Sequence, residues 1–219
     1  MSYDNELIYK LIVLGDVYVG KTTFLNVLSG KEFKNDLKST SGVDFKQLRY
    51  EDEMGRRIKC YIWDTAGQEI FRSIIKIYFK KIAGAVLMFD VSNRDSFYNI
   101  QEWYDTLREN NNGNYKIILV GNKIDKIDRC ISIDEAICMA NKLNIEYFEI
   151  SCKKNFNTEN ALSSLIENIT TDIVNKNKYC DGIESRILNP SDRNINLYTT
   201  VNAGAPLLGN SRRKKCCIF

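Results

Sequence analysis

Short runs of apolar, often β-branched residues alternate with longer segments of helical periodicity along most of the chain. The runs predict buried strands of a mostly parallel sheet, and they cover residues 7–14, 58–63, 83–90, 117–120 and 145–150. The helical segments are residues 21–29, 95–110, 133–143 and 158–174. This alternation predicts βαβ units in a three-layer sandwich, with helices covering both faces of the sheet.

Two further features modify this picture. Residues 45–50 and 57–63 are separated by a polar turn around residues 52–55, which predicts an antiparallel hairpin at one edge of the sheet. After about Asn177 the periodicity fades into a mostly polar segment. We therefore expect one compact domain over residues 1–177 and a flexible tail over residues 178–219.

Composition and charge exclude several classes of protein. The 219 residues are 44% hydrophobic, which suffices for a core, and the net charge is +3 with four basic residues together at 212–215. Such a nearly neutral body with one basic end argues against nucleic-acid binding and favours a local contact at the C-terminus. No histidine is present, so histidine-dependent catalysis and histidine-ligated metals are excluded.

Cysteine usage and hydropathy bear on the compartment. The seven cysteines contain no C-x-x-C pair, which indicates reduced thiols and neither a disulfide framework nor a zinc site. The N-terminus is acidic and polar, and no apolar stretch approaches the roughly 20 residues of a membrane span. We therefore expect a protein that is neither secreted nor transmembrane.

Residues 15–22, GDVYVGKT, fit the phosphate-loop pattern G-x-x-x-x-G-K-[ST] between a predicted strand and a predicted helix. There, backbone N–H groups and the helix N-terminus face a polyphosphate, Lys21 reaches the β and γ phosphates, and the Thr22 hydroxyl binds magnesium. An ordinary glycine-containing turn with a chance lysine is the alternative. The predicted contacts are Gly15, Val17, Tyr18, Val19, Gly20, Lys21, Thr22 and Thr23.

Asn122, Lys123 and Asp125 follow the predicted strand at 117–120 and predict a guanine site. The carboxylate of Asp125 can accept hydrogen bonds from N1–H and the exocyclic amine of guanine, which adenine lacks, and a site of this kind discriminates by a factor on the order of 10⁴. A simple turn would explain the tetrapeptide alone. When it follows a phosphate loop in the same chain, the tetrapeptide at residues 122–125 predicts recognition of the base. Ser151, Cys152 and Lys153 would close the base pocket.

At residues 63–69, WDTAGQE, the chain resembles the small GTPases of the Ras superfamily, and the Rab family most closely. Residues 41–45, SGVDF, and 66–72, AGQEIFR, are similar to Rab signatures but depart from them at Ser41 and Ile70. The likeness covers roughly residues 7 to 175 and the last few residues. It implies the P-loop NTPase fold: a three-layer α/β fold with a six-stranded, mostly parallel sheet, one antiparallel edge strand and about five helices.

The resemblance also implies roles for single residues. Thr40 would bind Mg²⁺ through its hydroxyl and the γ-phosphate through its N–H, while Thr22 and Asp64 complete the metal site. The N–H of Gly67 would contact the γ-phosphate, and Gln68 would orient the attacking water. The implied catalytic set is Lys21, Thr40 and Gln68, and the implied ligands are GTP or GDP with Mg²⁺.

Three aromatic residues, Phe45, Trp63 and Tyr78, match the triad that shapes Rab switch surfaces for effectors, although ordinary core packing would also explain them. Release of the γ-phosphate would alter the surface around residues 34–45 and 66–80. The implied partners are an exchange factor, a GTPase-activating protein, a dissociation inhibitor or escort protein, and effectors. We expect a monomer that does not bind nucleic acid.

Val17 and Tyr18 stand where Rabs usually have Ser-Gly, beside the β and γ phosphates. Their bulk predicts weak GTP hydrolysis, because it would crowd the water at Gln68 or an arginine from an activating protein. Alternatively, the loop shifts and Tyr18 points to solvent. The crowding favours a second function, a GTP-loaded scaffold whose cycling does not depend on hydrolysis. A third, an ATP-dependent P-loop kinase, shares the phosphate loop but leaves residues 122–125, residues 64–68 and the C-terminal lipid signal unexplained.

The chain ends in KKCCIF, which resembles a Rab geranylgeranylation signal at Cys216 and Cys217. The same ending fits a single-lipid C-a-a-X signal. One lipid plus a basic cluster, or two lipids, anchors a protein stably. We expect a switch in vesicle or organelle traffic on the cytoplasmic face of an intracellular membrane, such as endoplasmic reticulum, Golgi or another secretory-endosomal compartment, with a cytosolic pool.

Overall fold

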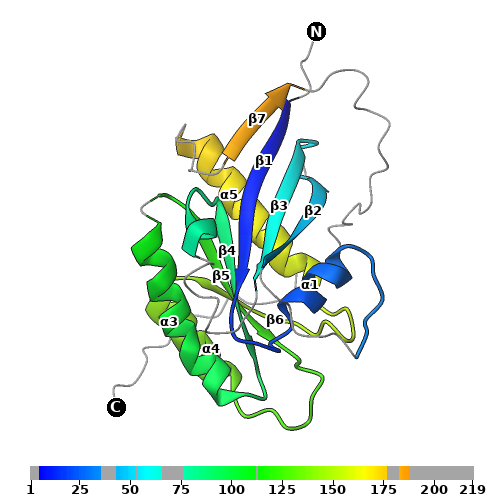
Figure 1. The fold of residues 1–219 in the computed structure, drawn as a ribbon, viewed down its shortest axis with the longest axis vertical. Coiled ribbons are helices and arrows are strands. Elements are labelled where there is room, and N and C mark those ends of the chain that lie inside the picture. The colour runs from blue at the N-terminus through cyan, green and yellow to red at the C-terminus, as the bar shows by residue number, and fades with distance from the viewer. Residues whose placement is uncertain are drawn as a thin grey trace.

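The computed structural model describes residues 5–35, 43–52, 54–65, 76–111, 113–176 and 183–187. Its elements are β1 (Asn5–Leu14), α1 (Lys21–Leu28), β2 (Val43–Glu51), β3 (Arg57–Thr65), the 3-10 helix η2 (Lys76–Phe79), β4 (Gly84–Asp90), α3 (Arg94–Asn110), β5 (Lys116–Asn122), α4 (Ile133–Leu143), β6 (Glu146–Glu149), α5 (Thr158–Lys176) and β7 (Ile183–Ile187). Figure 1 shows the strands as one twisted sheet with helices packed on both sides.

The main sheet has the strand order β2-β3-β1-β4-β5-β6. β1 pairs in parallel with β3 and β4, and β5 pairs in parallel with β4 and β6, whereas β2 runs antiparallel to β3 at the edge. The prediction of a six-stranded, mostly parallel sheet with one antiparallel edge strand is confirmed. The described residues contain four α-helices and one 3-10 helix, where about five helices were expected.

The strand β7 lies in the segment for which the sequence predicted only a flexible tail. It pairs antiparallel with the start of β1, with Tyr9 opposite Ile183 and Asn5 opposite Ile187. β4 pairs with β1 only over Leu11–Leu14, so β7 covers the part of that edge which β4 leaves open. An unpaired strand edge can bind another strand through backbone hydrogen bonds alone, without a particular pattern of side chains. For this reason hydrophobic periodicity did not reveal β7.

The helices begin where local hydrogen bonds satisfy their free N–H groups. Asn93 caps α3 by accepting from the N–H of Ser96 at 3.0 Å, and Ser132 and Glu135 form a capping box at the start of α4. α1 is different, because its N-cap is Gly20 and no side chain caps it. The first N–H groups of α1 therefore remain available to an anionic ligand.

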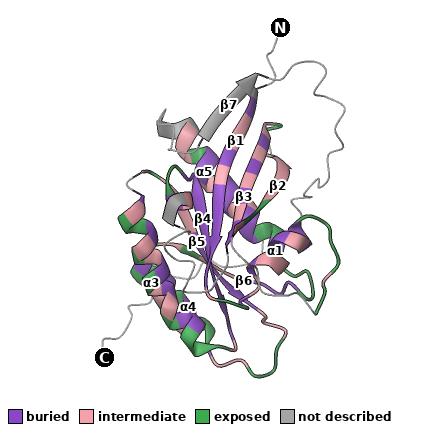
Figure 2. Cartoon of the chain, viewed as in Figure 1, coloured by how far each residue is buried: buried purple, intermediate pink, exposed green. Residues whose placement is uncertain are grey.

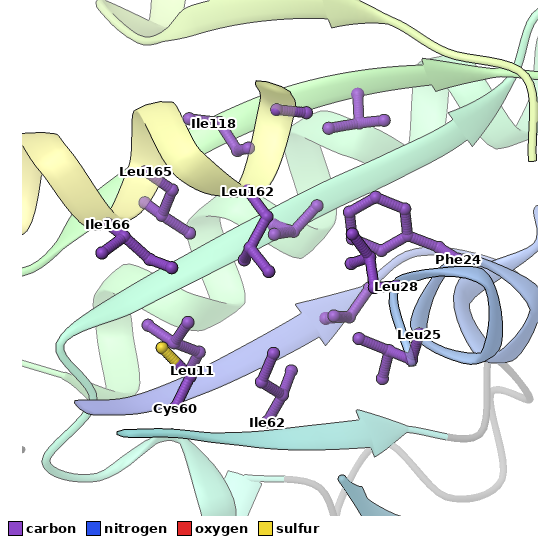
Figure 3. Close-up of a cluster of buried hydrophobic side chains, with 14 of the residues drawn as sticks. Leu11, Phe24, Leu25, Leu28, Cys60, Ile62, Ile118, Leu162, Leu165 and Ile166 are labelled. Atoms are coloured by element: carbon purple, nitrogen blue, oxygen red, sulfur yellow. The ribbon is translucent and has the colours of Figure 1, made fainter. Parts of the chain in front are cut away.

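Two apolar clusters hold the sheet between its helices, and Figure 2 shows the buried residues concentrated along the sheet and the inner faces of the helices. Successive residues of β1 point to opposite faces, so Leu11 belongs to one cluster and Ile12 to the other. In Figure 3, Leu11 and Ile62 of the sheet lie among Phe24 of α1 and Leu165 of α5. None of the described helices is long and apolar enough to cross a bilayer.

Candidate nucleotide site

Residues 15–20 connect β1 to α1 in a tight loop whose two ends must be glycine. Gly15 has φ 142°, and a Cβ there would lie 2.1 Å from the Met88 carbonyl oxygen of β4. Gly20 has φ 106°, and a Cβ there would lie 2.3 Å from Nδ2 of Asn122. Both positions need a left-handed backbone and leave no room for a side chain, so the loop lies directly against the ends of β4 and β5.

Lys21 starts α1 as a buried cation, with only 5% of its surface exposed. Its ammonium donates to the carbonyl oxygens of Gly15 at 2.8 Å and Asp16 at 2.7 Å. Burial lowers the pKa of Lys21 to about 8, against the opposing influence of Asp64 and Asp16. A desolvated positive charge at a helix N-terminus that no side chain caps is suited to bind phosphate.

Asp64 lies near the end of β3, opposite Val13 of β1, and is fully buried. Neither of its carboxylate oxygens makes a hydrogen bond to another described residue. Burial raises the pKa of Asp64, while the nearby Thr22 hydroxyl and the Lys21 ammonium oppose that rise. A buried carboxylate with open oxygens beside a hydroxyl has the chemistry of a hard-cation site.

Within the described ranges, no three acidic, cysteine or histidine side chains gather around a common point. A divalent ion at Asp64 and Thr22 would therefore need further oxygen ligands, which the phosphates of a nucleotide can supply. Mg²⁺ is commonly bound in this way, by one or two carboxylates plus substrate phosphates. The residues present thus fit a nucleotide-bound Mg²⁺.

Asn122, the last residue of β5, joins the phosphate loop to the loop after β6. Its amide donates to the carbonyl oxygen of Val19 at 2.9 Å, and its Oδ1 accepts from the N–H of Cys152 at 3.2 Å. In that second loop, the hydroxyl of Ser151 donates to Oδ1 of Asp125 at 2.5 Å. The sites predicted from residues 15–23, 122–125 and 151–153 therefore meet at one end of the sheet.

Lys123 makes a second link to the phosphate loop. Its ammonium donates to the carbonyl oxygen of Tyr18 at 2.6 Å and pairs with the carboxylate of Asp90 at 2.7 Å. Burial favours a higher pKa for Asp90, but hydrogen bonds from Lys123 and Ser92 outweigh it, and the pKa of Asp90 is lowered. Asp90 therefore stays charged and holds Lys123 over the loop.

Val17 and Tyr18 lie at the outer surface of the loop. Tyr18 has φ 64°, a left-handed conformation unusual for a bulky residue, and 69% of its surface is exposed. Val17 is exposed as well, at 36% of its surface. The tyrosine therefore faces solvent, as in the alternative in which the loop accommodates the two larger residues.

The three predicted surface aromatics lie in contact. The rings of Phe45 and Trp63 are 5.3 Å apart, and those of Trp63 and Tyr78 are 4.8 Å apart. Phe45 is 43% exposed, so these rings form a partly open cluster on β2, β3 and η2, in contrast to the closed interior.

Of the other predicted residues, Thr23 lies within α1 half-buried, and Lys153 lies exposed in the loop after β6. Thr40, Gly67, Gln68, Cys216 and Cys217 lie outside the described residues.

Sequence reasoning missed three residues that contact this site. Asp16 is an unspecified position of the phosphate-loop pattern, yet both of its carboxylate oxygens are bonded, by Asn99 at 2.7 Å and Trp103 at 2.8 Å. In the sequence, Trp103 is simply one of the residues of the predicted helix at 95–110. No local signal could have revealed these contacts, because Asp16 and its partners are 83 and 87 residues apart in the chain.

Comparison with known proteins agrees with this geometry. The Ras family pattern matches residues 10–171. The chain is 38% identical to Ras-related protein Rab-13 of Canis lupus familiaris over 169 residues, which cover 77% of this chain and 82% of that protein. It is 36% identical to Ras-related protein Rab-3 of Caenorhabditis elegans over 163 residues, which cover 74% of each chain.

A third relative extends the match into the tail. Ras-related protein SEC4 of Saccharomyces cerevisiae is 32% identical over 216 residues, which cover 99% of this chain and 93% of SEC4. The phosphate loop, the buried carboxylate of Asp64 and the loops around Asn122 thus occur in a sequence whose relatives are Ras-related proteins over the whole domain. The chain belongs to the Rab family of small GTPases in the Ras superfamily, which bind guanine nucleotides and hydrolyse GTP.

Proposed function

We propose that this GTPase is a magnesium-dependent switch, anchored on the cytoplasmic face of an intracellular membrane, that regulates vesicle or organelle traffic. The observation that carries the proposal is the junction at the phosphate loop, where Asn122 and Lys123 bond to the carbonyl oxygens of Val19 and Tyr18. The base loop and the phosphate loop thereby form one site. The role in traffic rests on membership of the Rab family.

In the phosphate part of this site, Lys21 exchanges its contacts with the Gly15 and Asp16 carbonyls for the β and γ phosphates. The N–H groups of the loop and the uncapped start of α1 bind the remaining phosphate oxygens. Gly15, Val17, Tyr18, Val19, Gly20 and Thr23 contribute the surrounding loop. Asp125 recognises guanine through hydrogen bonds from its carboxylate, which the Ser151 hydroxyl holds in place. Cys152 and Lys153 close the base pocket.

Thr22 and Asp64 are suited to hold Mg²⁺ together with Thr40, because Asp64 is buried with both oxygens open. When bound, the ion neutralises phosphate charge that develops during hydrolysis. For the chemical step we propose that Gln68 orients the attacking water, while Gly67 and Thr40 donate their N–H groups to the γ-phosphate. Lys21 stabilises the charge on the transferred group.

The aromatic cluster of Phe45, Trp63 and Tyr78 is proposed as part of the surface that effectors recognise in the GTP state. Its partial exposure supports this use, since a protein surface normally keeps few contiguous large apolar side chains open. An exchange factor, an activating protein and a dissociation inhibitor or escort protein would act on the same GTPase domain. We propose that the protein works as a monomer.

Membrane attachment is proposed to occur through geranylgeranyl groups on Cys216 and Cys217, supported by the basic residues 212–215. In this proposal residues 1–177 form the GTPase domain. In the remaining segment, residues 178–219, β7 pairs with the sheet and the residues after it form the tether. A secretory-endosomal membrane, such as the endoplasmic reticulum or Golgi, is the proposed location, with a cytosolic pool of protein.

A second function, a GTP-binding scaffold with impaired hydrolysis, is favoured by one observation. Tyr18 holds a left-handed conformation at φ 64° in the phosphate loop, beside Val17, where Rabs usually have smaller residues. If these side chains crowd the attacking water, the protein stays GTP-loaded. The outward position of Tyr18 favours the switch instead.

Single-turnover GTP hydrolysis, with analysis of the nucleotide that copurifies, tests both functions. The switch predicts measurable hydrolysis and bound GDP, with equal rates for the wild type and the Val17→Ser/Tyr18→Gly double variant. The scaffold predicts bound GTP and a marked gain of rate in that double variant. A protein that loads neither GTP nor GDP after being stripped and verified as folded would contradict both, and competition with ATP measures base selectivity.

A further inference from the structure

The carboxylate of Asp16, the second residue of the phosphate loop, is held from outside the loop by α3. The amide nitrogen of Asn99 donates to Oδ2 at 2.7 Å, and the indole N–H of Trp103 donates to Oδ1 at 2.8 Å. The two donors are four residues apart and so lie on the same face of the helix. Both oxygens of one carboxylate are thus bonded by one helix.

The main chain of Asp16 contacts the phosphate-binding lysine at the same time. Its carbonyl oxygen accepts from the Lys21 ammonium at 2.7 Å. The preceding residue, Gly15, lies so close to β4 that no Cβ fits there. Asp16 is therefore a short connection between α3 on one side and the ammonium of Lys21 on the other.

The helix that holds Asp16 is firmly placed. Trp103 is 1% exposed and belongs to the same apolar cluster as Ile100 and Leu107 of α3. Asn93 caps the start of the helix through the N–H of Ser96. A donor fixed in this way can hold the side chain that it bonds in one orientation.

Electrostatics gives a reason for holding this side chain. Asp16 carries a negative charge close enough to influence Lys21, and a free carboxylate there would compete with phosphate for that lysine. Hydrogen bonds to an ionised carboxylate are short and strong. The two bonds from Asn99 and Trp103 therefore hold the Asp16 carboxylate against α3 and away from Lys21. Loss of one would leave the carboxylate partly unpaired and able to turn.

We propose that Asn99 and Trp103 are positioning residues for the nucleotide phosphates. By bonding the Asp16 carboxylate, they hold the start of the phosphate loop so that Lys21 and the loop N–H groups face the ligand. The inference rests on the proposed phosphate site and adds to it a control point on α3, outside the loops that contact the nucleotide.

The test is the rate at which the full-length protein, loaded with a fluorescent GDP analogue in the presence of Mg²⁺, releases it. Trp103→Phe keeps an aromatic ring and removes the donor, and Asn99→Ala removes the other donor. We expect each substitution to accelerate release about fivefold, and the two together to accelerate it more. Release rates within twofold of the wild type for both variants would overturn the proposal.

A matched control separates positioning from general loosening of α3. Ile100→Val lies on the same helix and in the same cluster, has no polar contact, and should lower the melting temperature without changing the release rate. If Ile100→Val accelerates release as much as Trp103→Phe does, the effect is structural and the inference is wrong.

A double-mutant cycle tests whether Asn99 and Trp103 act through the Asp16 carboxylate. In an Asp16→Ala background, Trp103→Phe and Asn99→Ala should produce no further acceleration, because the carboxylate that they bond is gone. Full additivity would mean that they act elsewhere. If the wild type itself retains no guanine nucleotide, the proposed function fails. If it retains nucleotide and all variants release it at the wild-type rate, only the positioning role fails.

Discussion

Lys21 is a buried cation whose hydrogen-bond partners are two main-chain carbonyls. Because burial lowers its pKa to about 8, the free protein loses this charge as the pH rises through that value. Bound phosphate favours the charged form and raises the pKa again. Nucleotide affinity is therefore coupled to proton binding at this single residue.

We predict that affinity for GDP is full below about pH 8 and falls above it, because a proton must then be taken up on binding. Between about pH 7.5 and pH 9 the dissociation constant should rise roughly fivefold to tenfold. Calorimetric titration across this range measures the effect. Lys21→Met should bind weakly at every pH and lack this dependence, and an unchanged slope in Lys21→Met would assign the titration to another group.

The lowered pKa of Lys21 has the opposite effect on the stability of the nucleotide-free protein, which rises with pH while nucleotide affinity falls. Between about pH 8 and 10.5, the unfolded chain keeps the Lys21 proton that the folded protein has released. The contribution of Lys21 to the free energy of unfolding therefore increases with pH over that range.

Tyr18 offers a second prediction at this scale. Its φ of 64° suits glycine, so Tyr18→Gly removes strain, whereas Tyr18→Ala keeps a Cβ and most of the strain. We expect Tyr18→Gly to have a free energy of unfolding up to about 1 kcal/mol above that of Tyr18→Ala. Chemical denaturation of the two variants measures the difference, and a more stable alanine variant would contradict it.

Among the elements, the helices follow most directly from local sequence. Ser132 and Glu135 form a capping box that starts α4 at the predicted residue, and Asn144 ends it in a left-handed conformation at φ 55°. α3 and α5 were also expected within a few residues of their observed bounds. Propensity, caps and apolar spacing agree there, so no distant contact was needed to predict them.

We predict that Ser132→Ala lowers the free energy of unfolding by about 1 kcal/mol, because the N–H of Glu135 loses its acceptor. Ser132→Thr keeps a hydroxyl at the cap and should retain most of the stability. Denaturant titration of both variants measures this. Equal losses in the two would show that the hydroxyl contact contributes little.

At the scale of the whole molecule, β7 brings the polypeptide back to the sheet after α5. It pairs with β1 from Tyr9 to Asn5, and β1 runs from this end toward the phosphate loop. The last residue of β7 therefore lies beside the start of β1, whereas the nucleotide site lies at the other end of β1, as Figure 1 shows. Under the proposed lipidation of Cys216 and Cys217, a tether starting there would leave the domain on the side away from the nucleotide loops.

We predict that a Glu184→Pro/Ser185→Pro double variant opens this pairing. Neighbouring strand residues point their N–H groups to opposite sides, so one of the two prolines must remove a hydrogen bond to β1. Hydrogen exchange should accelerate in the amides of residues 5–9 that face β7, with little change in the part of β1 next to β4. Prolines at Asn202 and Ala203, beyond the strand, serve as the control, and identical exchange in both variants would contradict the pairing.

The fold and the candidate site differ in how far the sequence predicts them. Apolar runs and helical periodicity are local, so the mostly parallel strands, the edge hairpin and the helices could be inferred from them and are confirmed, whereas the strand order was not predicted. The phosphate-loop and base-loop motifs could be recognised because each consists of adjacent residues. The roles of Thr40, Gly67 and Gln68 stay predictions.

By itself, the sequence determined the chemistry of each loop and the family, because a short motif carries its own backbone and charge requirements. Only the tertiary structure decided which distant groups meet: Asn99 and Trp103 on Asp16, Asp90 on Lys123, and β7 on the open edge of β1. These contacts depend on where the packed core places the ends of strands and one face of a helix. No periodicity along the chain encodes that placement.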